Sequence, residues 1–164
     1  MDQKQTVIDT EIGRLYLVAS ARGLISVDFQ QQAAPMIEAE DTDAATRVLL
    51  QAGREFAEYF KGQRQDFEVP LAPTGTAFQM RVWDELRRIP YGSTCSYRDI
   101  AARVDNPKAV RAVGTANGRN PLCIVVPCHR VIAADGTLGG YTGGLQIKSQ
   151  LLALEQRRGT SVSA

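Results

Sequence analysis

The 164-residue sequence predicts a mixed α/β chain in which a small antiparallel sheet and a helix precede a mostly helical region. Three observations support this fold class. Short β-rich runs fill the first thirty residues, apolar residues then recur at helical spacing from Val48, and several helix-start motifs follow residue 74. The Pro- and Gly-containing stretch 70–75 separates the two regions. We therefore expect an N-terminal α/β domain over residues 1–73 and a second domain over residues 74–164.

The first region contains the strands and one helix. Apolar residues at three- and four-residue spacing between Val48 and Phe60 predict a helix, and residues 67–70 form a candidate edge strand. Three runs separated by turns at Gly13 and Gly23 predict the antiparallel sheet: 6–9, 15–19 and 24–29.

The second region contains successive helix starts. Capping-box patterns at 76–79 and 96–99 predict two of them, and Asn106 followed by Pro107 predicts a third. The second and third helices are short and closely connected, which is typical of a helix-turn-helix. The fully apolar run 122–126 predicts a buried strand. A last apolar stripe predicts a C-terminal helix through Ile147, Leu151 and Leu154.

Composition excludes several classes of protein. Hydrophobic residues make up 44% of the chain and charged residues 23%, which excludes extensive disorder. No apolar run is long enough to span a membrane, and the N-terminus does not resemble a secretory signal. Three cysteines without such a signal predict no disulfide framework and a cytoplasmic location. The single histidine and the absence of zinc-type spacings predict no metal site.

Charge is distributed unevenly along the chain. Residues 1–73 hold seven Lys and Arg against twelve Asp and Glu, a net charge of −5. Residues 74–164 hold twelve against six, a net charge of +6. The asymmetry favours either a polyanionic partner for the basic half or simple attraction between the two domains, and charge alone leaves both open.

The pentapeptide 127–131, Pro-Cys-His-Arg-Val, carries the strongest chemical signal. We expect the apolar run to end at its proline and to present Cys128 at the rim of a core. His129 and Arg130 are expected to lower the pKa of the thiol, and His129 can accept its proton. The alternative is a buried structural cysteine. Glu155 is the candidate partner for the second ring nitrogen of His129, with a solvated helix charge as the alternative.

The predicted helix over 109–118 has an unusually smooth surface. Small residues dominate it, and Arg111 projects from it. Such a surface permits close approach either to a nucleic-acid backbone or to another protein helix, and spacing does not decide between them. Arg111 alone would be interpreted as a solvated arginine.

Taken in order, these motifs resemble the O6-alkylguanine-DNA alkyltransferase (methylated-DNA–protein-cysteine methyltransferase) family. The pentapeptide 127–131 is preceded by Asn120 and Pro121 and followed by Gly-Tyr-Thr-Gly-Gly at 140–144. The resemblance is strong over residues 74–156 and loose over residues 1–73. It implies a ribonuclease H-like N-terminal domain and a winged helix-turn-helix C-terminal domain.

The resemblance also implies an activity. Such a protein repairs double-stranded DNA by moving the alkyl group of O6-alkylguanine, and of O4-alkylthymine, irreversibly to its own Cys128. The base is flipped out through the minor groove, because the target atom is unreachable inside the stack. The protein is then a single-turnover suicide enzyme without cofactor, metal or membrane association. We expect a monomer and leave clustering on DNA open.

Roles in catalysis carry over residue by residue. His129 resembles a general base that acts through water, and Glu155 resembles the residue that orients it. Asn120 resembles an asparagine that braces the active-site turn. Tyr97 resembles a tyrosine that contacts the flipped guanine and helps to protonate the leaving base.

Roles in binding carry over in the same way. Arg111 resembles an arginine finger that fills the vacated stack. Val131 offers a backbone carbonyl to the amino group of the base, and Lys148 matches a lysine near the pocket. The other positions expected to bind DNA or substrate are Ala112, Gly114, Gly118, Tyr141 and Thr142.

Three rival interpretations are separable. A lesion sensor without alkyl transfer would lack the nucleophile, which Cys128 argues against. A winged-helix regulator would read bases in the major groove and would need no Cys-His pair. A cysteine hydrolase would turn over repeatedly and would need an oxyanion hole.

Overall fold

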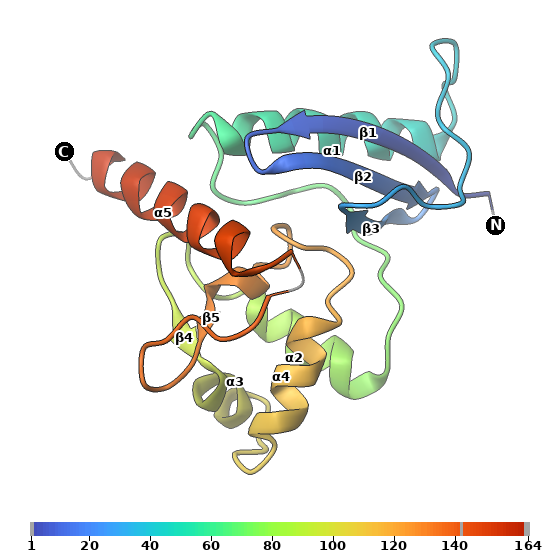
Figure 1. Ribbon diagram of the computed structural model, residues 1–164. Coiled ribbons are helices and arrows are strands. Elements are labelled where there is room, and N and C mark those ends of the chain that lie inside the picture. The colour runs from blue at the N-terminus through green and yellow to red at the C-terminus, as the bar shows by residue number, and fades with distance from the viewer. Residues whose placement is uncertain (1, 142, 163–164) are drawn as a thin grey trace. The chain divides into compact units, whose positions relative to one another are not determined.

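The computed structural model describes residues 2–141 and 143–162, with side chains through Arg157 (Figure 1). The chain forms two compact units, Met1–Thr74 and Gly75–Ala164. The first contains an antiparallel sheet and a helix, and the second is mainly helical. The predicted fold class is thus confirmed.

The sheet of the first unit is formed by β1 (Lys4–Thr10), β2 (Gly13–Ser20) and β3 (Gly23–Asp28), in that order and antiparallel. Lys4 pairs with Ala19, and Thr10 pairs with Gly13 across the first turn. All three predicted strands are present.

Helix α1 (Ala44–Phe60) lies along one face of this sheet (Figure 1). The helix predicted from Val48 onward is confirmed, but it begins four residues earlier, at a polar turn where the Thr46 hydroxyl donates to the Asp43 carboxylate. Its apolar stripe is buried and includes Val48, Leu49, Ala52, Phe56 and Tyr59.

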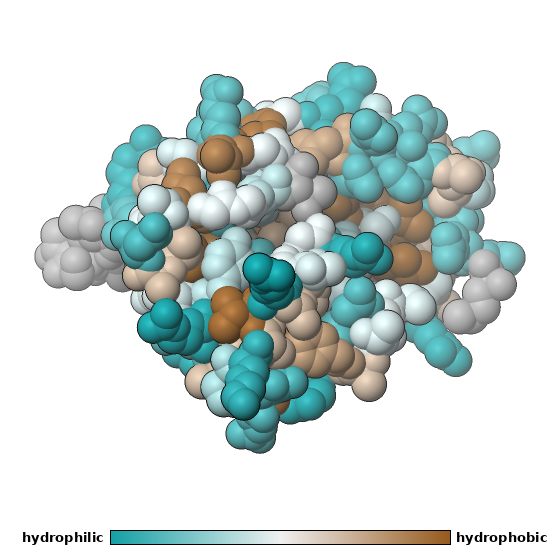
Figure 2. Space-filling view, turned by 60° about the horizontal axis from the view of Figure 1, so that its bottom comes forward, coloured by the Kyte–Doolittle hydropathy of each residue, from teal (hydrophilic) through white to brown (hydrophobic). Residues whose placement is uncertain are grey.

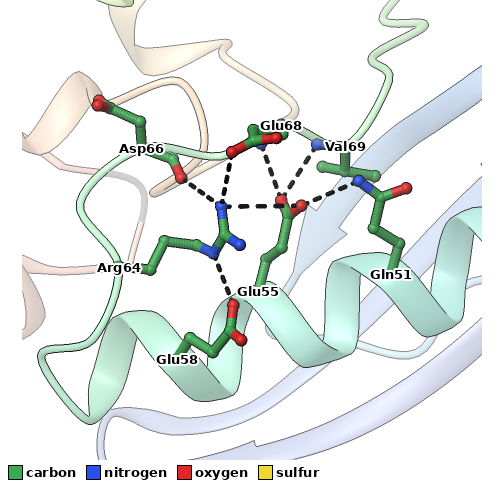
Figure 3. A network of polar contacts seen from close by, with 7 residues as sticks. All are labelled: Gln51, Glu55, Glu58, Arg64, Asp66, Glu68 and Val69. Carbon is green, nitrogen blue, oxygen red and sulfur yellow. Dashed lines mark hydrogen bonds and ion pairs between the residues drawn. The ribbon is translucent and has the colours of Figure 1, made fainter.

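A buried carboxylate fixes the chain that follows α1 (Figure 3). Glu55 is 2% exposed and accepts hydrogen bonds from the backbone N–H groups of Glu68 and Val69 at 3.0 and 3.1 Å. Arg64 donates to Glu58 at 2.7 Å and to the carbonyl of Asp66 at 3.0 Å. These contacts hold an irregular segment against the helix without a strand ladder.

The predicted edge strand over 67–70 is wrong, because these residues form no strand and the chain pairs with the sheet one residue later. The only pairing there is an isolated bridge between Leu71 and Leu24, with Leu24 N–H donating to Pro70 O at 2.7 Å. Gly23 makes the approach possible, because a Cβ at this position would lie 2.6 Å from the same carbonyl oxygen.

The second unit begins with two capped helices. Thr76 and Gln79 form a reciprocal capping box at the start of α2 (Ala77–Leu86). Ser96 and Asp99 do the same for α3 (Tyr97–Arg103). Both predicted capping boxes are confirmed, because a cap depends on residues within one turn of each other.

Helix α4 (Val110–Gly118) starts later than predicted. Asn106 does not cap it. Its carbonyl instead accepts from Ala109 N–H at 2.9 Å in a separate turn, and Ala109 occupies the N-cap position without a side-chain hydrogen bond. The preceding Asp105 has φ 57°, in the left-handed region, so the chain reverses before the helix begins.

The apolar run 122–126 is buried as predicted, but it is not a strand. Ile124 has φ 74°, and Val126 N–H donates back to Leu122 O at 2.8 Å, which folds the run into a tight turn. The short parallel pair that follows was not predicted. It consists of β4 (Cys95–Ser96) and β5 (Val131–Ile132).

The remaining regular elements are the 3₁₀ turn η1 (Cys128–Arg130) and helix α5 (Leu145–Val162). Among the described residues, no helix combines the length and apolar character needed to cross a membrane. Within the same part of the chain, no group of three or more His, Cys, Asp or Glu side chains is placed to hold a metal ion.

Candidate active site around Cys128

Cys128 is the first residue of η1 and follows the tight turn of residues 122–126 after Pro127. Asn120 spans that turn: its Nδ2 donates to Val126 O at 2.8 Å, and its Oδ1 accepts from Leu122 N–H at 2.9 Å. The residue predicted to brace the active-site turn therefore contacts both of its ends, which fixes where the backbone presents the thiol.

The thiol is buried and protonated. Cys128 is 2% exposed, and burial raises its pKa to about 11, although Asn120 and the charge of Lys148 act in the opposite direction. The expectation that neighbouring basic residues would lower this pKa is wrong, because desolvation of the thiolate outweighs them. A nucleophilic Cys128 therefore needs a base at the moment of reaction.

The side chains of His129 and Glu155 are in contact in the interior of the second unit. Nε2 of His129 lies 2.7 Å from Oε2 of Glu155, and the two side chains are 0% and 1% exposed. Burial lowers the pKa of His129 despite the nearby carboxylate, so the ring is neutral near pH 7. A neutral ring that donates from Nε2 has Nδ1 as its acceptor. That atom is buried and has no hydrogen-bond partner among the described residues.

Glu155 stays ionised although it is buried. Burial opposes ionisation, but hydrogen bonds from His129 and Arg130 together lower the pKa of Glu155 to about 2. Arg130 donates to it twice, from Nε at 2.8 Å and from Nη2 at 3.0 Å. The alternative of a solvated helix charge is therefore wrong for Glu155.

Arg130 has a larger role than its sequence position suggested. Besides its two bonds to Glu155, its Nη1 donates to Ile89 O at 2.7 Å, and its guanidinium lies 5.6 Å from the ring centroid of Tyr91. It thus connects η1, α5 and the chain after α2. The sequence did contain one indication of this role. Arg130 directly follows His129, and a buried arginine at that position needs a carboxylate partner, for which Glu155 was already the candidate.

Lys148 organises the loop beside the thiol. Its side chain is fully buried, and its ammonium donates to the backbone carbonyls of Val131 at 2.6 Å, of Gly140 at 3.1 Å, and of Leu138. It also lies 5.9 Å from the ring centroid of Tyr97. The Val131 carbonyl, predicted to contact the base, therefore already accepts one hydrogen bond and has a second lone pair available.

Tyr97 lies against the same loop. Burial, followed by the nearby thiol, raises the pKa of its hydroxyl, so the group is a proton donor near neutral pH. Gly139 has φ 70°, and a Cβ there would lie 2.9 Å from Tyr97 Oη. Only glycine fits both the backbone angle and the contact.

A pocket of about 520 Å³ opens beside these residues. Of the predicted site residues that the structure describes, four line it, namely Tyr97, Gly114, Gly118 and Tyr141. Three further lining residues were not predicted: Val110, Asn117 and Gly140. Pocket lining depends on chain segments far apart in sequence, which spacing could not reveal.

Two of the other predicted binding residues lie outside that lining. Arg111 and Ala112 are exposed on α4. Thr142 lies outside the described residues. With the α3 and α4 end brought forward, Figure 2 shows hydrophobic patches that are small and set among hydrophilic residues. This face does not have the character of a large apolar interface.

Comparison with known proteins decides the family. The ribonuclease-like domain of 6-O-methylguanine DNA methyltransferase matches residues 4–73, and the DNA binding domain of the same family matches residues 77–157. The chain belongs to the 6-O-methylguanine DNA methyltransferase family. The family and the enzyme class predicted from the sequence are confirmed.

Relatives of this methyltransferase family match nearly the whole chain. The methylated-DNA–protein-cysteine methyltransferase of Methanosarcina acetivorans is 46% identical over 150 residues, 91% of this chain and 96% of that protein. The crystal structure of the Mycobacterium tuberculosis O6-methylguanine methyltransferase is 41% identical, with a TM-score of 0.82 over 95% of this chain and 94% of the other. The structure of Mycobacterium tuberculosis OGT in complex with DNA is 40% identical, with a TM-score of 0.81 over 96% and 94%.

Proposed function

We propose that this chain repairs alkylated DNA by transferring the alkyl group from O6 of guanine to Sγ of its own Cys128, once per molecule. The observation that carries the proposal is a buried, protonated thiol followed directly by a neutral histidine whose Nε2 lies 2.7 Å from an ionised Glu155. Family membership and the solved relative in complex with DNA support DNA as the substrate.

The proposed step is a nucleophilic displacement at the alkyl carbon attached to O6. The Sγ–C bond forms while the O6–C bond breaks, the thiol proton passes to Nδ1 of His129, directly or through water, and the departing guanine takes up a proton at N1 from solvent. The Tyr97 hydroxyl supports departure of the base by donating a hydrogen bond, since an anionic guanine leaves poorly. Glu155 stabilises the imidazolium that forms on His129.

Access to the thiol requires an extrahelical base. The target oxygen lies inside the duplex, and Cys128 lies below the surface of the protein, so the nucleotide must leave the stack and enter the pocket. Arg111, exposed on α4, is proposed to fill the vacated stack, and the small residues Ala112, Gly114 and Gly118 permit close approach of the DNA backbone.

The proposed reaction ends with a stable thioether. A thioether is a poor leaving group, so the alkyl group stays on Cys128 and each molecule acts once. Every group assigned here comes from one chain, and a monomer is sufficient. O4-alkylthymine is proposed as a second substrate.

Intact-mass spectrometry tests the proposal. The protein is incubated with a duplex that contains one O6-methylguanine, and its peptides are then mapped. A stoichiometric and permanent gain of one methylene mass on the Cys128 peptide is expected, and Cys128→Ser should bind the same duplex without any gain. Tight binding without a mass change would instead identify a lesion sensor, and repeated turnover would identify a hydrolase-like enzyme.

A further inference from the structure

We propose that Asn117 determines substrate specificity by accepting a hydrogen bond from the exocyclic amino group of the alkylated guanine through its side-chain oxygen. This inference rests on the proposed function and assigns a role to a residue that sequence reasoning did not select. Asn117 lies on α4, is 3% exposed, and lines the pocket beside Cys128.

The contacts of Asn117 fix the orientation of its amide. Nδ2 donates to the backbone carbonyl of Cys128 at 3.4 Å. Exchanging the nitrogen and the oxygen would bring two acceptor oxygens to that distance, which is unfavourable. The oxygen therefore points away from this carbonyl.

The oxygen of Asn117 has no partner within the described chain. It is buried and accepts no hydrogen bond from any described residue. Two other buried polar groups nearby do have partners: Asn120 Oδ1 accepts from Leu122 N–H, and Trp83 Nε1 donates to Ala116 O at 2.9 Å. A buried acceptor without a donor lowers stability, and it gains one when a ligand brings an N–H group to it.

The chemistry of the substrate selects the donor. In an O6-alkylated guanine, O6, N1, N3 and N7 are all without hydrogen, so the exocyclic amino group provides the only N–H of the base. This amino group lies on the same edge as the alkylated oxygen, on the other side of N1. A base that directs its alkyl group at Sγ of Cys128 thus turns its amino group toward residues that contact Cys128, of which Asn117 is one.

The exocyclic amino group also distinguishes two substrates. O4-alkylthymine has no N–H group on its ring, because alkylation removes the hydrogen from N3. It leaves the Asn117 oxygen buried and unpaired, whereas O6-alkylguanine satisfies it. A site that loses a buried hydrogen bond discriminates more strongly than one that loses apolar contact. Asn117 therefore favours alkylguanine over alkylthymine.

The test compares single-turnover rates on matched duplexes. One carries O6-methylguanine, one carries O6-methylhypoxanthine, which lacks only the amino group, and one carries O4-methylthymine. Asn117→Leu replaces the amide with an apolar group of similar size, and Asn117→Ala provides a second, smaller replacement. Thr115→Val is the matched control, since Thr115 is exposed on the same helix and its hydroxyl donates to the backbone carbonyl of Arg111 at 3.2 Å.

The expected result is a change in discrimination. The wild type should favour methylguanine over methylhypoxanthine, and both Asn117 variants should reduce that ratio about tenfold, the effect of one neutral hydrogen bond. Thr115→Val should keep the wild-type ratio. Equal ratios in the wild type and in whichever Asn117 variant remains folded by thermal melting would overturn the role of Asn117 while leaving the repair function intact. Failure of the wild type to acquire the methyl group from any of the three would overturn the proposed function and, with it, this inference.

Discussion

Replacing Glu155 with Gln tests the ion pair that supports the proposed base. The variant keeps the size of the side chain and its contact with His129, but it leaves the Arg130 guanidinium buried without a counter-charge. Removing one partner of a buried pair costs about 3–5 kcal/mol. The depressed pKa gives a second magnitude: the contacts of Glu155 lower its pKa from 4.5 to about 2, and at about 1.4 kcal/mol per pKa unit this equals about 3 kcal/mol.

The sign of the pH dependence follows from the direction of that shift. Because the folded-state pKa lies below the unfolded value, the stabilisation by Glu155 is complete above about pH 4.5 and is lost as the pH falls toward 2. The free-energy difference between wild type and Glu155→Gln should therefore be about 3–5 kcal/mol at pH 7. It should shrink by about 2 kcal/mol between pH 4.5 and pH 3.

Urea unfolding monitored by the fluorescence of Trp83 measures this difference, since Trp83 is buried on α2 in the same unit. Glu85→Gln is the control. Glu85 pairs with Arg88 at 2.8 Å, but Arg88 is 73% exposed, so its loss should cost under about 1 kcal/mol. A wild-type-minus-Glu155→Gln difference that does not change between pH 6 and pH 3 would refute the reasoning.

Three further predictions concern the reaction and the loop beside the thiol. Arg111→Ala should slow transfer from duplex DNA far more than transfer from the free O6-methylguanine base, and equal losses in single-turnover assays would contradict a finger role. The transfer rate should be level between about pH 6.5 and 8 and should fall only in more acidic solution, because burial keeps the pKa of His129 below its usual 6.5. A tenfold rise per pH unit would mean that the thiol ionises without His129. Lys148→Met should speed hydrogen exchange of the Gly140 amide, which bonds the Tyr97 hydroxyl, at least tenfold, at about 1.5–3 kcal/mol per lost charged hydrogen bond, and unchanged exchange would show that the ammonium does not hold this loop.

Local signals in the sequence predicted the local structure. The capping boxes at Thr76 and Ser96 were predictable because each involves residues within a single helical turn. Asn106 was misleading, since it is also a good turn residue, and the left-handed Asp105 before it gave no distinct signal. The run 122–126 was recognisably buried, but apolarity alone does not distinguish a strand from a tight turn.

The sequence predicted which residues form the candidate site, but it did not predict the pKa of the thiol or every contact in the site. Cys128, His129 and Glu155 were selected from the sequence, and the structure places the last two in contact. The predicted direction of the shift in the Cys128 pKa was wrong, because the burial of the thiol depends on packing across the whole unit, which the sequence does not show. Arg130 and Asn117 were missed because their partners, Glu155 and the Cys128 carbonyl, are fixed by tertiary structure.

The ammonium of Lys148 fixes the path of its loop by binding several backbone oxygens at once, as a bound metal cation would. All three of its hydrogen-bond acceptors in the described part of the loop and strand are main-chain oxygens, and these are present whatever side chains the loop carries. The shape of this pocket wall is therefore encoded by one residue on α5, outside the loop itself. Side chains along the loop are free to change the size and polarity of the pocket while its backbone path is retained, with Gly139 as the position that Tyr97 does not allow to vary.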